Sequence, residues 1–423
     1  MMIHDSKRGP WRAICATALA ATAIAAIGPR GVALGTSGDE AETTWKIYAD
    51  QVFTEPGNVL ENCLLLVQDG KIKALAAGRS VSDDDDVISV ACVTAGMVDA
   101  SAGLHTGYTS VEQSQEIQPQ RRAQDSLDVF DHRWHRQARS GVTTTIVSPY
   151  DRNVIGGLSV AVKTAGSDTV ADRIVAADVC VRGAIGSLPS SGNRPWGRPT
   201  DFYQRRPTTR MGVEWEWRKA MYDAGFAAQD ESRAFDGSAE LGSVLAGETP
   251  LCIQAWATQD VRTAIFLKEE MQAEGFGEIN LIVDAAAEAW KEPDLLVRSN
   301  TAVILPPFTA GGRMREGAFM PWGAAKTLVD LGIRVALSSH GAKPAGARLA
   351  NQAGFAMRGG LTLDEALAAV TTAPAEMFGI GDQVGKVRTG GAADLVLWNG
   401  TPFEATSRIV GVLVDGNLVL DPR

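Results

Sequence analysis

Several polar side chains lie at the ends of apolar, strand-like runs, where side chains from neighbouring strands can meet. Asp99 closes the run TAGMVD, and the small residues after it, including Ser101 and Gly103, are typical of a strand that passes into a loop. His105 lies two residues beyond Gly103 and points to the same side if the strand continues, because side chains alternate along a strand. His340 follows the run GIRVALSS. Imidazole and carboxylate groups bind zinc and act as general acids and bases, so these strand ends are where we expect any catalytic site.

The sequence contains none of three common local signatures of catalysis. It has no G-x-S-x-G elbow, no phosphate-binding loop of the G-x-x-x-x-G-K type and no H-E-x-x-H pair. Four cysteines lie beyond the first residues of the chain, and none has the C-x-x-C spacing of a zinc ribbon or redox pair. We expect them to be buried as small hydrophobic side chains, and the sequence leaves a disulfide open. They are Cys63, Cys92, Cys180 and Cys252.

Length and composition indicate a folded protein with a large core. The chain has 423 residues, of which 45% are hydrophobic and 21% charged, and its formal charge is −10. This length suits one barrel of about 250 residues and an accessory domain. The negative charge argues against a nucleic-acid partner.

The first residues differ from the rest of the chain. Lys7, Arg8 and Arg12 precede an apolar run over residues 13–27, which is shorter than a bilayer span but fits the apolar region of a signal peptide. We predict a signal peptide over residues 1–35 and export to the periplasm or the extracellular space, with no membrane span in the mature chain. An uncleaved N-terminal membrane anchor is the alternative.

The two ends of the chain share a β-strand character. Residues 45–93 alternate as strands do, and the QDGKI segment predicts a hairpin because Asp-Gly adopts the positive φ of tight turns. The run SRIVGVLVDGNLVLD near the end repeats this pattern. We therefore predict one small β-sandwich built from both termini, with residues 44–94 as its first part and 385–423 as its second.

Strands and helices alternate between these two blocks. Short apolar runs such as GVTTTIVSP, PLCIQAW, INLIVDA and TAVILPP are separated by longer helical stretches such as QRRAQDSLDVFDHRWHRQARS. The segment LTLDEAL opens a helix with Thr362 and Glu365 at capping-box spacing. This alternation predicts an α/β fold in which residues 95–384 form a parallel (β/α)8 barrel.

Several segments together resemble the amidohydrolase superfamily, and the imidazolonepropionase-like group in particular. They are TAGMVDA, GVTTTIVSP, NVIGGLSVAVK, TTRMGVEWEWRKA, LTLDEALAAVTTAPAEMFGI and VGKVRTGGAADLVLWNGTPFE. The resemblance runs from about residue 44 to the end of the chain. It implies a (β/α)8 barrel with a two-ended β-sandwich and, ordinarily, metal-dependent hydrolysis of amide or other C–N bonds.

The resemblance also implies where metal ligands should lie. The superfamily holds one or two divalent ions, often zinc, at the barrel mouth with histidines, a lysine or glutamate, and a catalytic aspartate on the last strand. In this chain all six positions are changed, and the aspartate position is occupied by Ser339. The residues found there are Ser101, Gly103, Ser187, Gln254, Ala285 and Ser339. If Ala285 faces the barrel interior, strand alternation turns its neighbour Asp284 toward the helices.

Three alternatives follow for function. The leading prediction is an exported amidohydrolase-like protein without an intact metal site, which binds a small molecule at the barrel mouth, forms a homo-oligomer or pairs with an active homologue. This prediction includes no metal cofactor and assigns no catalytic residue. The second is a working C–N hydrolase with a metal-free or relocated site, for which His105, Glu112, Gln254 and His340 are the pocket candidates. A purely structural role is the third, and no residue pattern favours it.

Overall fold

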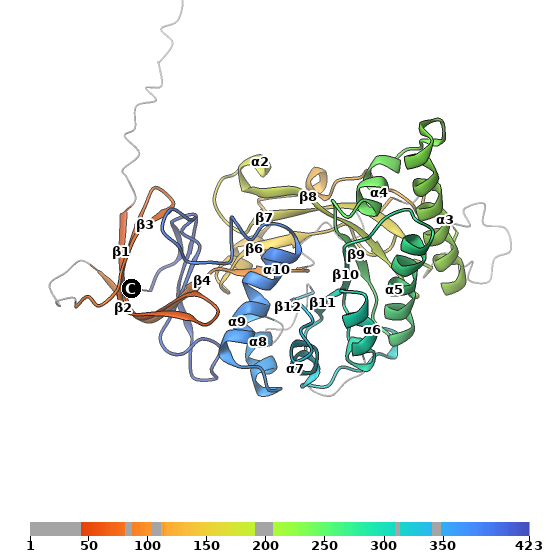
Figure 1. Ribbon diagram of the computed structural model, residues 1–423. Helices are drawn as coiled ribbons and strands as arrows, with labels where there is room; N and C mark the ends of the chain where they lie inside the picture. Colours follow the sequence, from red (N-terminus) through yellow and green to blue (C-terminus); the bar gives the residue numbers. More distant parts are fainter. Residues whose placement is uncertain are drawn as a thin grey trace, which may run out of the picture. The chain divides into compact units, whose positions relative to one another are not determined.

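The computed structural model describes residues 44–80, 87–102, 111–112, 114–190, 206–308, 314–340 and 348–422. Gly103, His105 and the predicted signal peptide lie outside these residues. Within the described ranges, no helix combines the length and the apolar character that crossing a bilayer requires. The described chain forms two β-sheets, each with its own hydrophobic core (Figure 1).

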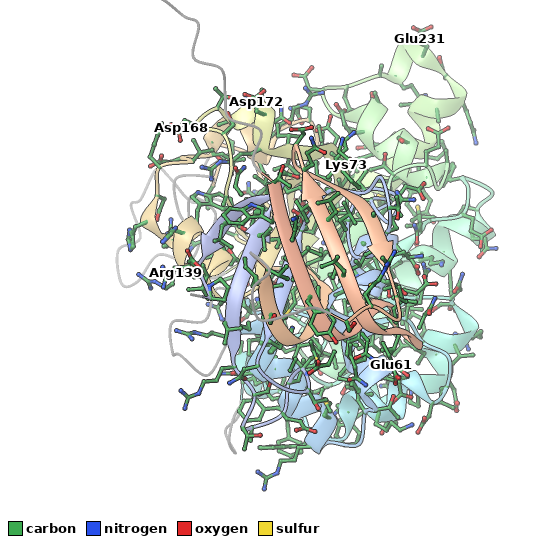
Figure 2. The ribbon with its side chains drawn as sticks, turned by 90° about the vertical axis from the view of Figure 1, so that its left-hand side faces the viewer. Glu61, Lys73, Arg139, Asp168, Asp172 and Glu231 are labelled. Carbon is green, nitrogen blue, oxygen red and sulfur yellow. The ribbon has the colours of Figure 1, made fainter. Side chains whose placement is uncertain are left out.

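The first sheet is built from both ends of the chain, as the sequence predicts. It has seven strands in the order β15-β14-β13-β4-β1-β2-β3. Figure 2 views it from the side of β1, β2 and β3, with Glu61 and Lys73 on the strands nearest the reader. The strands are β1 (Thr44–Glu55), β2 (Asn58–Gln68), β3 (Lys71–Ala76), β4 (Ile88–Ala95), β13 (Leu395–Trp398), β14 (Ile409–Val414) and β15 (Asn417–Leu420).

Both predicted Asp-Gly hairpins are present in this sheet. Asp69 and Gly70 connect β2 to β3 with φ of 50° and 72°, and Asp415 and Gly416 connect β14 to β15 with φ of 45° and 74°. The two turns pack against each other so closely that a Cβ on Gly416 would lie 2.7 Å from the Cα of Gly70. Glycine at these positions therefore satisfies both the positive φ and the close approach.

The second sheet is the barrel, with eight strands in the order β12-β11-β10-β9-β8-β7-β6-β5. The fold prediction is confirmed except for one strand, because β7 runs antiparallel to both β6 and β8. A short connection without a helix joins β6 to β7, which explains the reversal. The strands are β5 (Met97–Asp99), β6 (Val142–Val147), β7 (Ile155–Lys163), β8 (Ile174–Ala184), β9 (Leu251–Gln254), β10 (Leu281–Asp284), β11 (Ala302–Leu305) and β12 (Val335–Leu337).

Helices lie along the outside of the barrel strands, and Figure 1 shows α3, α5 and α6 beside β9, β10 and β11. The α-helices are α1 (His132–Ala138), α2 (Val170–Arg173), α3 (Arg210–Gln229), α4 (Ser238–Leu245), α5 (Thr258–Ala273), α6 (Pro293–Arg298), α7 (Ala324–Val329), α8 (Leu349–Arg358), α9 (Leu363–Val370) and α10 (Thr372–Met377). The 3-10 helices are η2 (Ala123–Ser126), η3 (Glu231–Arg233), η4 (Ala289–Lys291) and η5 (Arg315–Gly317).

Side-chain caps explain where α9 and α1 begin. The capping box of Thr362 and Glu365 is present at the start of α9, as predicted. The long helix expected over residues 120–140 is wrong, because only η2 and α1 form there. Asp131 accepts a hydrogen bond from the backbone N–H of Arg133 and so caps α1 at His132, which prevents one continuous helix.

Alternation along the barrel strands separates two layers of core. Ile282 in β10 and Cys252 in β9 belong to the apolar interior of the barrel, whereas their neighbours Val283 and Ile253 pack between strands and helices. The interior is apolar at depth and becomes polar where the strands end. These four cysteines are buried, as predicted, and they are free, which answers the question that the sequence left open.

Candidate functional site

A cavity of about 450 Å³ opens where the barrel strands end. Most of its walls come from the exits of β5, β6, β8, β9, β11 and β12. The lining residues are Ser101, Ala102, Ile146, Ser148, Pro149, Tyr150, Asp151, Arg182, Leu188, Gln254, Trp256, Pro306, Pro307, Met314, Arg315 and His340. We call this cavity the mouth cavity.

A buried guanidinium forms one wall of the mouth cavity. Arg182 in β8 is 3% exposed at its side chain, and its Nε donates to Asp151 Oδ1 at 2.6 Å. Its Nη2 donates to Asp151 Oδ2 at 2.9 Å and to Asp284 Oδ2 at 2.5 Å, while Nη1 donates to the Sγ of Cys252 at 3.1 Å. The planar fork of arginine thus serves two carboxylates at once, which a lysine ammonium at the same place could not do with this geometry.

The strand that carries Arg182 is held in place by a close approach from outside the barrel. Trp217 in α3 is buried, and its indole donates to the carbonyl of Ala184 at 3.0 Å. A Cβ on Gly183 would lie 2.3 Å from the Trp217 ring, so only glycine lets the ring pack there. The position of Arg182 therefore depends on its immediate neighbours in β8.

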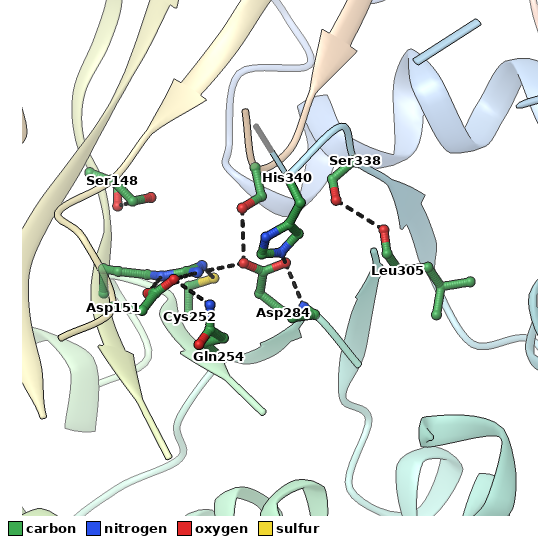
Figure 3. Close-up of polar contacts among 12 residues, drawn as sticks. Ser148, Asp151, Cys252, Gln254, Asp284, Leu305, Ser338 and His340 are labelled. Carbon is green, nitrogen blue, oxygen red and sulfur yellow. Dashed lines mark hydrogen bonds and ion pairs between the residues drawn. The ribbon is translucent and has the colours of Figure 1, made fainter. Parts of the chain in front are cut away.

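Asp284, at the end of β10, is the centre of the polar network (Figure 3). Its Oδ2 accepts from the hydroxyl of Ser101 at 3.0 Å, and its Oδ1 lies 3.0 Å from His340 Nε2. It is fully buried and faces the barrel interior, so the expectation that it points toward the helices is wrong. The side chains of β10 that face the barrel interior are those of Ile282 and Asp284. Ala285 lies after the end of the strand and has a φ of 55°.

Asp284 and His340 determine each other's ionisation through their opposite charges. Burial alone would raise the pKa of Asp284, but His340 and Arg182 hold it well below its usual range. Burial alone would lower the pKa of His340, but the Asp284 carboxylate raises it above its ordinary value. Asp284 is therefore an anion, and it favours the imidazolium form of His340.

Asp99 connects the first and last strands of the barrel sheet. Its Oδ1 accepts from the backbone N–H of Ser339 at 3.1 Å and from that of Ser101 at 3.3 Å. Its Oδ2 accepts from the Gln137 side chain at 3.2 Å. Burial raises the pKa of Asp99, although the hydrogen bonds from Ser339 oppose that effect. Asp99 thus joins the exits of β5 and β12.

The six substituted positions are not all brought together. Ser101 and Gln254 line the mouth cavity, and Ser339 binds Asp99 through its backbone. Ser187 donates its backbone N–H and its hydroxyl to Glu316, outside the cavity lining. Ala285 is fully buried.

The pocket candidates are likewise divided. Gln254 and His340 line the mouth cavity, and the Nε2 of Gln254 donates to Asp151 Oδ2 at 2.5 Å. Glu112 does not line it and instead accepts from the backbone and hydroxyl of Ser114 at 2.9 and 2.7 Å. A cluster of His105, Glu112 and His340 therefore receives no support from Glu112.

The sequence analysis does not predict two residues of the buried ion-pair network, Asp151 and Arg182. Arg182 is the only charged residue in the second half of a strand whose other members there are apolar or small, VCVRGA. A charge in such a run indicates a buried partner and is a usable signal. Asp151 lies in a loop after β6 and carries no comparable signal.

Comparisons with known proteins agree with this architecture. Residues 322–419 match the Amidohydrolase family. The chain is 25% identical over 431 aligned positions to Amidohydrolase tasK of Hapsidospora irregularis, covering 92% of this chain but only 42% of that longer protein.

Two solved structures extend the comparison to the fold. An amidohydrolase from Thermotoga maritima has a TM-score of 0.73 at 25% identity, covering 89% of this chain and 100% of that one. A beta-aspartyl dipeptidase from Fervidobacterium islandicum, in complex with a beta-Asp-Leu dipeptide, has a TM-score of 0.52 at 15% identity and covers 90% of this chain and 97% of that one.

The two-ended sheet and these matches show that the chain resembles amidohydrolases in sequence and in fold. This resemblance raises the question of whether the mouth cavity could hold a divalent metal ion.

The described residues do not fit a divalent metal. Among them, no three His, Cys, Asp or Glu side chains are grouped so that they could hold an ion. Asp151 and Asp284 are both ion-paired with Arg182, and the Nε2 of His340 contacts Asp284. A second positive charge beside the guanidinium would be repelled, because like charges a few ångströms apart are strongly unfavourable in a buried site.

Proposed function

We propose that this chain is a superfamily member whose barrel mouth binds a small molecule without carrying out metal-dependent hydrolysis. One observation carries the proposal: the Arg182 guanidinium lies between Asp151 and Asp284, the two carboxylates nearest to it at the barrel mouth. In the superfamily, the metal supplies the nucleophile by lowering the pKa of bound water from 15.7 to about 7. An arginine is a fixed cation and does not activate water in that way.

Metal-free hydrolysis is the second candidate, and the order of side chains argues against it. In serine hydrolases the histidine lies between the serine and the aspartate, so that it can accept the hydroxyl proton. Here Asp284 lies between Ser101 and His340. Its depressed pKa makes it a weak base for the Ser101 hydroxyl.

Turnover assays on the purified chain test the proposal. A panel of amides, lactams and dipeptides would be incubated with the protein, with and without added zinc or manganese. The proposal predicts no turnover under either condition. Turnover that depends on added metal would overturn it. Metal-independent turnover that is lost in Ser101→Ala would support the second candidate instead.

A further inference from the structure

The carboxylates at the barrel mouth are saturated with donors. Asp151 accepts three hydrogen bonds, two from Arg182 and one from Gln254. Asp284 accepts from Ser101, Arg182 and the backbone N–H of Ala285, and its Oδ1 also lies within hydrogen-bond distance of the His340 ring. Neither carboxylate therefore has much capacity left to receive a cation or a donor from a ligand.

The groups with unused capacity on the cavity wall are mainly donors. Arg315 in η5 is exposed, and within the described ranges its guanidinium has no recorded carboxylate or hydrogen-bond partner. The indole N–H of Trp256 is buried without a hydrogen-bond partner among the same residues. Among the described residues of this wall, Gln254 Oε1 is the one buried side-chain acceptor without a hydrogen-bond partner.

An apolar wall accompanies these donors. Ile146, Pro306, Pro307 and Met314 line the same cavity, and the rings of Trp256 and His340 lie 5.5 Å apart. A cavity of this size and mixed lining is typical of small-molecule sites, in which a few polar groups orient an apolar body.

We propose that the mouth cavity binds a small-molecule carboxylate, with Arg315 and the Trp256 indole as the donors that recognise its oxygens. The apolar wall takes the carbon skeleton. Charge supports this choice, since Arg182 and His340 together balance Asp151 and Asp284, and Arg315 adds a positive charge to the lining, so the wall does not favour a cation. This inference rests on the proposed function, because it assigns the ligand class of the same metal-free site.

Isothermal titration calorimetry on the full chain tests the ligand class. The probes are benzoate, phenylacetate and hexanoate as carboxylates, with benzamide and benzylamine as a neutral and a cationic analogue of benzoate. A charge-assisted hydrogen bond predicts that benzoate binds about tenfold more tightly than benzamide, and that benzylamine binds more weakly still. Arg315→Gln should remove the preference for benzoate over benzamide.

Arg139→Gln is the matched control, because Arg139 is also exposed but does not line the cavity and lies on the outer surface in Figure 2. It should leave the benzoate affinity unchanged. Equal or tighter binding of benzamide or benzylamine, an unchanged affinity in Arg315→Gln, or no binding of any carboxylate would each overturn the inference.

The same titrations separate this inference from the proposed function. Each is repeated after removal of metals with a chelator. Carboxylate binding that disappears with the metal and returns with zinc would overturn the proposed function. A chain that binds no metal and shows no carboxylate preference would overturn the ligand class alone.

Discussion

Two buried clusters in this protein have the same composition, one cation and two aspartates, but differ in their surroundings. At the barrel mouth, Arg182 joins Asp151 and Asp284, with side chains 3%, 12% and 0% exposed. Between β7 and the seven-stranded sheet, Lys163 joins Asp394 and Asp415, with 9%, 7% and 41% exposed. Asp151 and Arg182 of the first cluster line the mouth cavity; we name the second the junction cluster.

The difference teaches what each cluster can do. The Lys163 ammonium is a single point charge that joins two parts of the fold, so the junction cluster is structural. The Arg182 fork distributes its contacts over several nitrogens and holds the pKa of Asp284 low while it forms a wall for a ligand. In the proposed function, the mouth cluster therefore occupies the place that a metal ion would take.

A third cluster, more exposed at its cation, completes the comparison. A single nitrogen of Arg210, Nη2, contacts both Asp260 at 2.8 Å and Glu316 at 2.9 Å. Burial, and to a lesser extent Glu316, raise the pKa of Asp260 to about 6 against the opposing effect of Arg210. One nitrogen shared by two carboxylates thus neutralises them less completely than a fork does.

The largest expected effect comes from Arg182→Met, which leaves buried Asp151 without a charged partner and Asp284 with His340 alone. Breaking a buried ion pair in this way costs about 3–5 kcal/mol of unfolding free energy. Urea unfolding measures the loss, and Arg182→Lys should recover part of it because the charge returns without the fork. A loss no larger than that of an exposed arginine would contradict the role assigned to Arg182.

Lys163→Met should have a smaller effect, because Asp415 is half-exposed and can be solvated. We expect a loss of about 2–3 kcal/mol, below the range for a fully buried pair. Calorimetric benzoate binding should stay as in the original chain. A weakened affinity would show that the junction cluster and the mouth cavity are coupled, which would break the comparison.

Asp260→Asn should change how stability depends on pH. Because the pKa of Asp260 is raised in the folded state, its stabilising contribution is complete below the ordinary value of 3.8 and is lost as pH rises through about 6. The original chain should therefore lose on the order of 2 kcal/mol relative to the variant over this interval. Thermal unfolding in buffers across the interval measures this, and parallel curves for the two proteins would contradict it.

Ser101→Ala should have the smallest effect. It removes one hydrogen bond to Asp284, whose other donors remain, so the expected loss is about 1 kcal/mol. Urea unfolding is again the measurement. A loss above that of Lys163→Met would mean that Ser101 does more than donate this bond.

The sequence predicts the fold well because hydrophobic alternation and Asp-Gly turns are local signals. It places both hairpins, the two-ended sheet and the capping box of Thr362. It misses the reversed direction of β7, since a parallel and an antiparallel buried strand have the same apolar pattern.

The site is harder to predict, because its contacts join residues far apart in the chain. Ser101 and Asp284 are separated by 183 positions and meet only when the barrel forms. A one-residue error in strand alignment reverses which side chain faces inward, and that error assigned Ala285 rather than Asp284 to the interior. The sequence shows which metal-ligand positions of the family are substituted. It does not show that Arg182 lies beside them.

Metal analysis of the purified chain tests the central claim most directly. The protein would be equilibrated with excess zinc, freed of unbound ions and assayed for bound metal, and its thermal unfolding would be compared before and after chelation. The account predicts substoichiometric zinc and an unchanged unfolding midpoint, because Asp151 and Asp284 are already paired with Arg182 and His340. One tightly bound zinc ion per chain, with a midpoint that falls on chelation, would contradict it.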